Sequence, residues 1–188
     1  KLALGSAQSS QAEATTIEKV RESKALVLSE EERNMNGAPE GELFVAEVLS
    51  REQIEASPYE GLPPREMLET TVIPALTAKT SKPWNIEFDA LTTLRRILVH
   101  HSSIISSTDL EILVPAIVKA IRNSRSTLAK NAIFSVADLF LKCAQVLTEL
   151  SQDAIDALCF ALLDSTASNV AKSLRTAAAE ALNQAVAT

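Results

Sequence analysis

The residue types that could act as catalysts or metal ligands are few in this sequence. The two histidines, His100 and His101, are adjacent, and the two cysteines are Cys143 and Cys159. No Cys, Asp or Glu stands at ligand spacing from the histidine pair, as a zinc site would require. Both cysteines fall among apolar residues, which favours buried thiols over a disulfide or a metal pair. No phosphate loop, GxSxG or HExxH motif is present. We therefore expect no enzyme, no cofactor and no metal.

Residues suited to protein recognition are more informative. Trp84 is the only tryptophan, and an exposed tryptophan at a rigid turn is a frequent interface anchor. Arg125, Lys130 and Lys172 follow it along the chain and could attract an acidic protein surface. A lone tryptophan is otherwise most often a core residue. Whether Trp84 is exposed or buried therefore depends on its position within the predicted helices.

These elements repeat. From Lys82 to the end, apolar residues recur 42 residues apart in four rows: Ile86, Leu128 and Val170; Ala90, Ala132 and Leu174; Leu94, Val136 and Ala178; Leu98, Phe140 and Leu182. Within each copy the rows are four residues apart, which is the spacing of one helix face. A helical unit repeated at about 40–47 residues is typical of α-solenoids such as HEAT and armadillo arrays.

The pattern predicts three helical hairpins. The helices are expected over 64–78 and 84–102, 108–121 and 126–146, then 151–164 and 169–188. Pro74 should kink the first helix, and Pro115 lies inside the third. Thr108 and Glu111 form a potential capping box, and Ser126 and Ser168 are expected N-caps. The fold class is therefore all-α, an α-solenoid of about three HEAT-type hairpins over residues 62–188.

Residues 1–61 form an acidic, mostly irregular extension. They mix Ser, Gln, Glu and Gly without lasting periodicity, and 17–33 and 43–56 are the only candidates for short helices. Residues 1–81 carry eight basic and fourteen acidic residues, whereas 82–188 carry ten of each. A neutral repeat region argues against a nucleic-acid partner. No apolar run is long enough for a membrane span, and free cysteines suit a reducing, cytoplasmic setting.

In a stacked array, the turns between paired helices lie side by side along one edge. This edge should hold Lys82, Trp84, Ser124, Arg125, Ser126, Lys130, Asn169 and Lys172, and the opposite edge Asp109, Glu111, Glu149 and Asp153. The charges could merely complement helix termini, which explains acids at helix starts but not cations there. The position of Trp84 is held by Ser126 and Ser168 in the later copies, which favours partial exposure.

The chain resembles a TOG domain of the CLASP and crescerin-type microtubule regulators. The resemblance is carried by KPWNIEFDALTTLRRILVHHSSII, RNSRSTLAKNAIFSVADLFLK and ALLDSTASNVAKSLRTAAAEAL. Such domains are paddles of six HEAT repeats that bind αβ-tubulin through the turns on one edge. The resemblance implies that Trp84, Ser124 to Ser126, and Asn169 with Lys172 occupy the first three of these turns.

The resemblance implies a cytoplasmic, cytoskeleton-associated interaction module that binds tubulin or microtubules. The chain departs from the family in holding three repeats, so an uncapped last hairpin predicts self-association, another protein partner or further sequence. The alternative function is a HEAT-repeat scaffold for a partner other than tubulin.

Overall fold

The computed structural model describes residues 46–56, 61–80 and 83–187. The chain divides into two units, Lys1–Leu43 and Phe44–Thr188, and every described residue belongs to the second. The helix expected over 17–33 lies outside the described residues. All regular secondary structure in the described ranges is helical. None of the helices found there combines the length and the apolar character that crossing a membrane requires.

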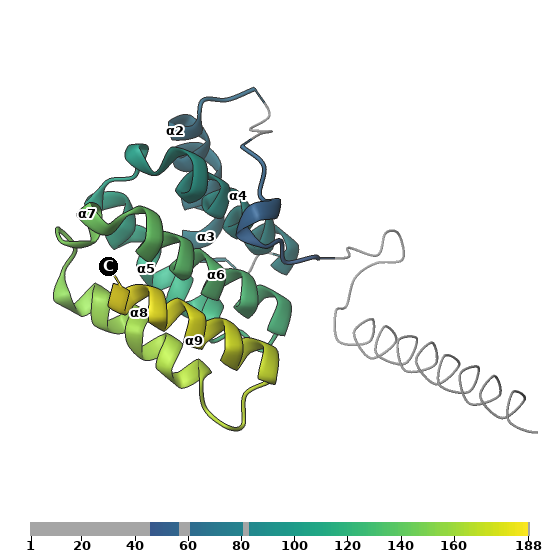
Figure 1. The fold of residues 1–188 in the computed structure, drawn as a ribbon. Helices are drawn as coiled ribbons and strands as arrows, with labels where there is room; N and C mark the ends of the chain where they lie inside the picture. The colour runs from purple at the N-terminus through teal and green to yellow at the C-terminus, as the bar shows by residue number, and fades with distance from the viewer. Residues whose placement is uncertain (1–45, 57–60, 81–82, 188) are drawn as a thin grey trace, which may run out of the picture. The chain divides into compact units, whose positions relative to one another are not determined.

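The helices follow one another in pairs (Figure 1). The first pair joins α2 (Pro64–Met67), a π-helical turn (Leu68–Val72) and α3 (Ile73–Thr77) to α4 (Trp84–His101). The second pair is α5 (Ser107–Ile121) and α6 (Ser126–Lys142), followed by the short α7 (Ala144–Leu147). The third is α8 (Gln152–Ser165) and α9 (Lys172–Ala187).

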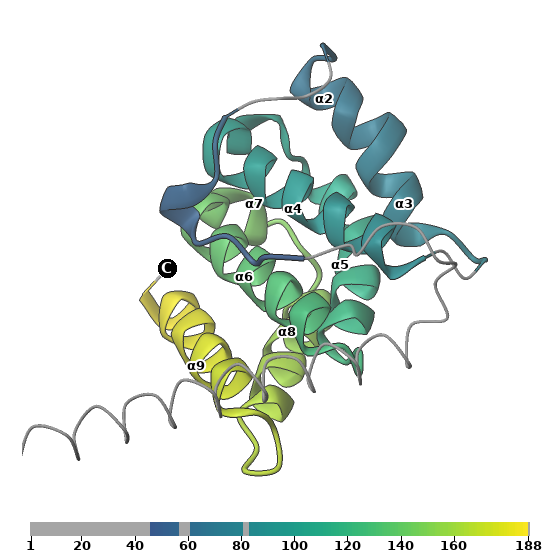
Figure 2. The ribbon, with the colours of Figure 1, turned by 90° about the vertical axis from the view of Figure 1, so that its right-hand side faces the viewer.

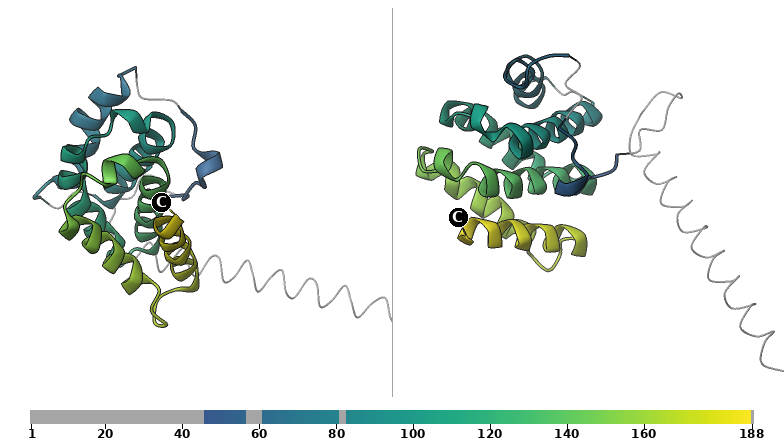
Figure 3. Two further views of the ribbon diagram at one scale, coloured as in Figure 1. Left: turned by 60° about the vertical axis from the view of Figure 1, so that its left-hand side comes forward. Right: turned by 45° about the horizontal axis from the view of Figure 1, so that its top comes forward.

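The paired helices lie in two layers. The first helices pack in the order α3, α5, α8, and the second helices in the order α4, α6, α9. The right-hand view of Figure 3 shows the second layer as successive rows. Because α6 also packs on α5, it contacts neighbours on three sides. Its buried residues include polar ones, namely Asn131, Ser135 and Asp138.

The 42-residue rows lie mainly in the core between the layers. Leu94, Val136 and Ala178 are all buried, as are Leu98 and Phe140. The row at Ile86 is an exception, because Ile86 is 39% exposed while Leu128 is fully buried. Val170 of the same row lies in the turn before α9. The 42-residue spacing therefore identifies the buried face of the second helix of each pair, except in the first helical turn.

The first helix accommodates Pro74 by widening. The π-helical turn Leu68–Val72 comes directly before the proline, and the amide of Ile73 donates to the carbonyl of Leu68, five residues back. Proline has no amide proton and its ring crowds the carbonyl four residues earlier, so a wider turn relieves the clash. The expected kink thus takes the form of a π-turn, whereas α5 continues through Pro115.

The predicted caps are wrong in detail. The N-cap of α5 is Ser106, whose amide donates to Asp109 Oδ2 at 2.9 Å, so the capping box lies two residues before Thr108 and Glu111. Ser126 is the first residue of α6 and not its cap. Instead, Asn123 Oδ1 accepts the amide of Arg125 and shapes the turn.

Two helix boundaries also differ from the expectation. The helix α9 begins at Lys172, three residues after Asn169, because backbone hydrogen bonds such as Val170 N to Ala167 O continue the turn past Ser168. Ser168 is consequently a turn residue. The helix α6 ends at Lys142 and α7 follows Cys143, so the single helix expected to 146 is two.

Residues 46–56, called the strap below, pack on the second layer (Figure 2). The helix expected over 43–56 is absent from this segment, whose only regular element is a three-residue 3₁₀ turn, Arg51–Gln53. Ile54 is 3% exposed, and Ala46 and Val48 pack against the core. The strap therefore belongs with the helices and is continuous with their hydrophobic core.

Candidate protein-binding edge and the strap network

The turns between paired helices are joined side by side through their side chains. Across the first two turns, the guanidinium of Arg125 lies 5.2 Å from the ring centroid of Trp84. Across the second and third, Arg122 Nη2 lies 3.2 Å from Asp164 Oδ2. These contacts place the turns along one edge, called the turn edge below.

Trp84 is held in a fixed orientation on this edge. It is the first residue of α4, it is half-buried, and its ring meets that of Phe88 edge-on at 6.2 Å between centroids. An indole fixed between an aromatic edge and a guanidinium loses little conformational freedom on binding a partner. Its partial exposure is compatible with an anchor, although Arg125 covers part of its surface.

The cations of the turn edge are partly neutralised within the chain. Arg122 pairs with Asp164, and Lys119 Nζ lies 3.7 Å from Glu87 Oε1. Asn169 and Lys172 are exposed, as are Ser124 and Ser126. The edge therefore combines a fixed aromatic residue with exposed polar groups and a modest positive charge.

Of the other two residues predicted for this edge, the structure describes Lys130. The ammonium of Lys130, one turn into α6, lies 5.5 Å from the ring centroid of Phe134, and Arg95 lies 5.0 Å from the same ring. Lys82 lies outside the described residues.

The acids of the opposite edge serve helix starts. Asp109 closes the capping box of α5 and pairs with Arg65 at 2.5 Å, and Glu111 Oε1 accepts the amide of Ser151 before α8. Burial alone would raise the pKa of Asp109, but hydrogen bonds from Arg65 and Ser106 outweigh it and lower the pKa below its ordinary value. Helix capping therefore explains the positions of these two acids, and no binding protein has to be invoked for them.

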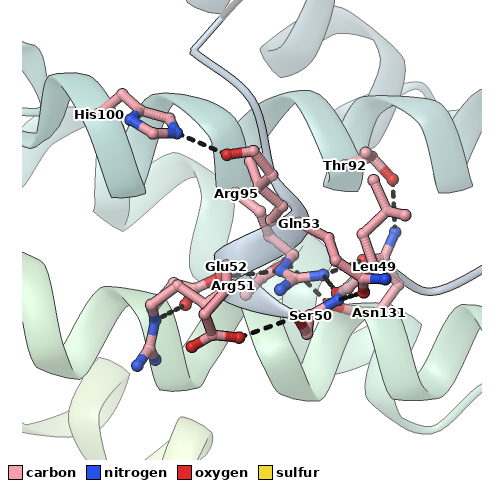
Figure 4. A network of polar contacts seen from close by, with 12 residues as sticks. Leu49, Ser50, Arg51, Glu52, Gln53, Thr92, Arg95, His100 and Asn131 are labelled. Atoms are coloured by element: carbon pink, nitrogen blue, oxygen red, sulfur yellow. Dashed lines mark hydrogen bonds and ion pairs between the residues drawn. The ribbon is translucent and has the colours of Figure 1, made fainter.

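A buried polar network lies beneath the strap (Figure 4). Asp138 on α6 accepts from Arg95 Nε on α4 at 2.8 Å through one oxygen and from Arg51 Nε on the strap at 2.6 Å through the other. Asp138 and Arg95 are each 1% exposed. Arg51 also reaches Gln184 on α9 at 3.2 Å. One carboxylate thus joins the strap to the second layer.

The remaining donors of the network are also satisfied. Arg95 Nη1 donates to Asn131 Oδ1 at 3.2 Å, and the Asn131 amide donates to Thr92 Oγ1 at 2.9 Å and to the carbonyl of Phe88. Burial lowers the pKa of Arg95, and the charge of Asp138 opposes the shift. Such a network is stable only while each buried group has a partner.

The strap contributes mainly backbone carbonyls. Its carbonyls at Leu49, Ile54 and Glu55 accept from Arg95, His100 and Arg96 of α4, at 2.7, 2.7 and 3.0 Å. The histidine pair therefore includes one residue that holds the strap. Beside Arg51, a cavity of about 170 Å³ remains between the strap and α6 and α9.

Sequence analysis missed Arg51, Arg95 and Asp138. A signal was available, because Asp138 is the only charged residue in the run Ala132–Leu141, whose spacing predicts a buried helix. A carboxylate in such a run needs a buried cation. Among the residues described, no three His, Cys, Asp or Glu side chains gather as a metal site would require. Burial raises the pKa of the Cys143 thiol to about 11, which makes it a poor nucleophile.

Comparisons with protein-family models, curated proteins and solved structures find no match for this chain.

Proposed function

We propose that residues 62–188 are a HEAT-type solenoid, similar to a TOG domain, that binds tubulin or a microtubule through the turn edge. The two-layer order of first and second helices is the arrangement that stacked helical repeats adopt. The module acts by binding and carries out no reaction. A cytoplasmic location at the cytoskeleton follows from such a partner.

One observation carries the proposal. Trp84 is held at the start of α4 by Phe88 and Arg125, where it links the first two turns and remains half-buried. Rigid aromatic residues beside exposed polar groups are typical of binding hot spots. Lys172 and Asn169 extend this surface to the third turn and add exposed groups that suit an acidic protein.

The test compares binding to purified tubulin at low salt by the wild-type chain and by the Trp84→Ala, Arg125→Ala, Lys172→Ala triple variant. We expect the triple variant to lose binding while circular dichroism shows it folded. Lys142→Ala is the matched control, because this exposed lysine lies at the other end of α6. Unchanged binding by the folded triple variant would exclude the turn edge. Absence of binding by the wild type would exclude tubulin and leave the repeat fold standing.

The second candidate is a HEAT-repeat scaffold with a partner other than tubulin. It is favoured by the exposed apolar residues Phe160 (60% exposed) and Leu163 (50% exposed) on α8. Leu163 stands 42 residues after Ile121, which is buried. Such a face suits self-association or another protein. The neutralised cations Lys119 and Arg122 also weaken attraction to a strongly acidic surface.

A further inference from the structure

We propose that the groove of α4, α6 and α9 beneath the strap is a second binding site, which recognises an extended peptide with an arginine followed three residues later by an aliphatic residue. The strap is the occupant of this groove within the chain, and a partner peptide replaces it. The site is separate from the turn edge and does not depend on tubulin binding.

The contacts divide into a general part and a specific part. Arg95, Arg96 and His100 donate to three backbone carbonyls of the strap, and any peptide of the same path offers such carbonyls. Specificity comes from Arg51 and Ile54. Arg51 binds Asp138 and Gln184, and Ile54 is the one fully buried side chain of the described strap.

The spacing of these two side chains follows from the local backbone. Arg51–Gln53 is a 3₁₀ turn, which has about three residues per turn, so residues 51 and 54 share one face. Ser50 fixes the turn, since its amide donates to Gln53 Oε1 at 2.7 Å. A ligand with the same two residues closer together or farther apart cannot fill both positions.

The strap fills the groove incompletely, which allows replacement. A cavity of about 170 Å³ beside it is lined by Ser50, Arg51 and Glu52 of the strap and by Phe134 and Ala137 of α6. Most side chains of the strap remain exposed or half-buried. Release of the strap uncovers one fully buried apolar side chain, Ile54, and breaks hydrogen bonds that a peptide following the same path would make again. Opening leaves Asp138 without Arg51, and an arginine from a partner restores that pairing.

The test uses a fluorescently labelled peptide with the sequence of residues 46–56. It is added to the full chain carrying Arg51→Ala and Ile54→Ser, called the released variant because loss of both side chains is expected to free the strap, and fluorescence anisotropy is measured. We expect saturable binding to this released variant. We expect binding to the wild type to be at least ~10-fold weaker, because a tethered strap competes at high effective concentration.

Two control peptides test the specificity. One carries alanine and serine in place of the arginine and isoleucine, and the other has one alanine inserted between Glu52 and Gln53. Both should bind at least tenfold more weakly than the parent peptide to the released variant. Equal binding of either control would overturn the proposed recognition.

Groove variants locate the binding site. Added to the released variant, Asp138→Asn removes the charge that pairs with the arginine and should weaken peptide binding at least tenfold. If Asp138→Asn does not fold, Gln184→Ala and Arg96→Ala replace less buried groove residues and should each weaken binding measurably. A folded released variant that binds no peptide, or a wild type that binds it equally well, would refute the proposal.

Discussion

Two arginine–aspartate pairs of this chain join neighbouring helices at similar distances but in different surroundings. Arg95 and Asp138 meet at 2.8 Å with both side chains 2% exposed, beneath the strap. Arg122 and Asp164 meet at 3.2 Å on the turn edge, with side chains 55% and 67% exposed. The first pair has further partners in Arg51 and Asn131.

The difference shows what each region can do. A buried ion pair stabilises a fold only when its hydrogen bonds are complete, and loss of one partner leaves an unpaired charge away from water. An exposed pair contributes about 0–1 kcal/mol and exchanges readily for water or another protein. The buried network beneath the strap therefore tolerates only a segment that supplies the missing hydrogen bonds. On the turn edge, the exposed ion pair can separate at little cost when another protein binds.

The largest effect is expected at the buried pair. Asp138→Ala should lower the free energy of unfolding by about 3–5 kcal/mol, because Arg95 remains buried without its counter-charge. The exposed control Asp164→Ala should change it by no more than about 0.5 kcal/mol. Urea unfolding followed by circular dichroism measures both. Similar effects in the two variants would show that burial does not distinguish the pairs.

Truncation of apolar core side chains gives stability losses with which those of the ion-pair variants can be compared. Leu94→Ala and Phe140→Ala should each cost about 2–5 kcal/mol, since both side chains are buried between the layers. Ile86→Ala, in a neighbouring row of the same repeat, should cost less than about 1 kcal/mol because Ile86 is 39% exposed. Thermal melting measures the series. Unchanged melting in the first two variants would contradict the assigned core.

Asp109 and Arg65 form an intermediate case, in which only the acid is buried. Because the pKa of Asp109 is lowered in the folded chain, its contribution to stability is present above its ordinary pKa, near 3.8, and is lost as pH falls through the folded value. Arg65→Gln should lower stability at pH 7 by about 1 kcal/mol and reduce the loss below pH ~4. Urea titrations between pH 2 and 7, with Lys142→Gln as control, test this prediction. If Arg65→Gln loses as much unfolding free energy below pH ~4 as the wild type, Arg65 does not lower the pKa of Asp109.

The sequence predicted those features that depend on periodicity. The pairing of helices and the buried row of Leu94, Val136 and Ala178 follow from apolar spacing, because each pair can bury its face only against the next. The turn between α5 and α6 lies where it was predicted, whereas the turn before α9 extends three residues farther than expected. Trp84 could be located at the start of a helix, although its contact with Arg125 joins residues that no spacing rule connects.

Features that depend on competition between nearby groups were not predictable. Ser106 and Thr108 are both plausible caps, and Asp109 decides between them through its additional bond to Arg65. The strap has no periodicity because it is held by its carbonyls, which carry no sequence signal. The start of α9 at Lys172 likewise depends on the turn hydrogen bonds after α8.

The position of Trp84 has a spectroscopic consequence. It is the only tryptophan in the sequence, so the tryptophan emission of the chain arises at the turn edge alone, beside a guanidinium and partly in contact with water. The groove beneath the strap has no such fluorophore among its lining residues. Intrinsic fluorescence of an unlabelled chain therefore observes the turn edge directly, whereas occupation of the groove has to be followed with a labelled peptide.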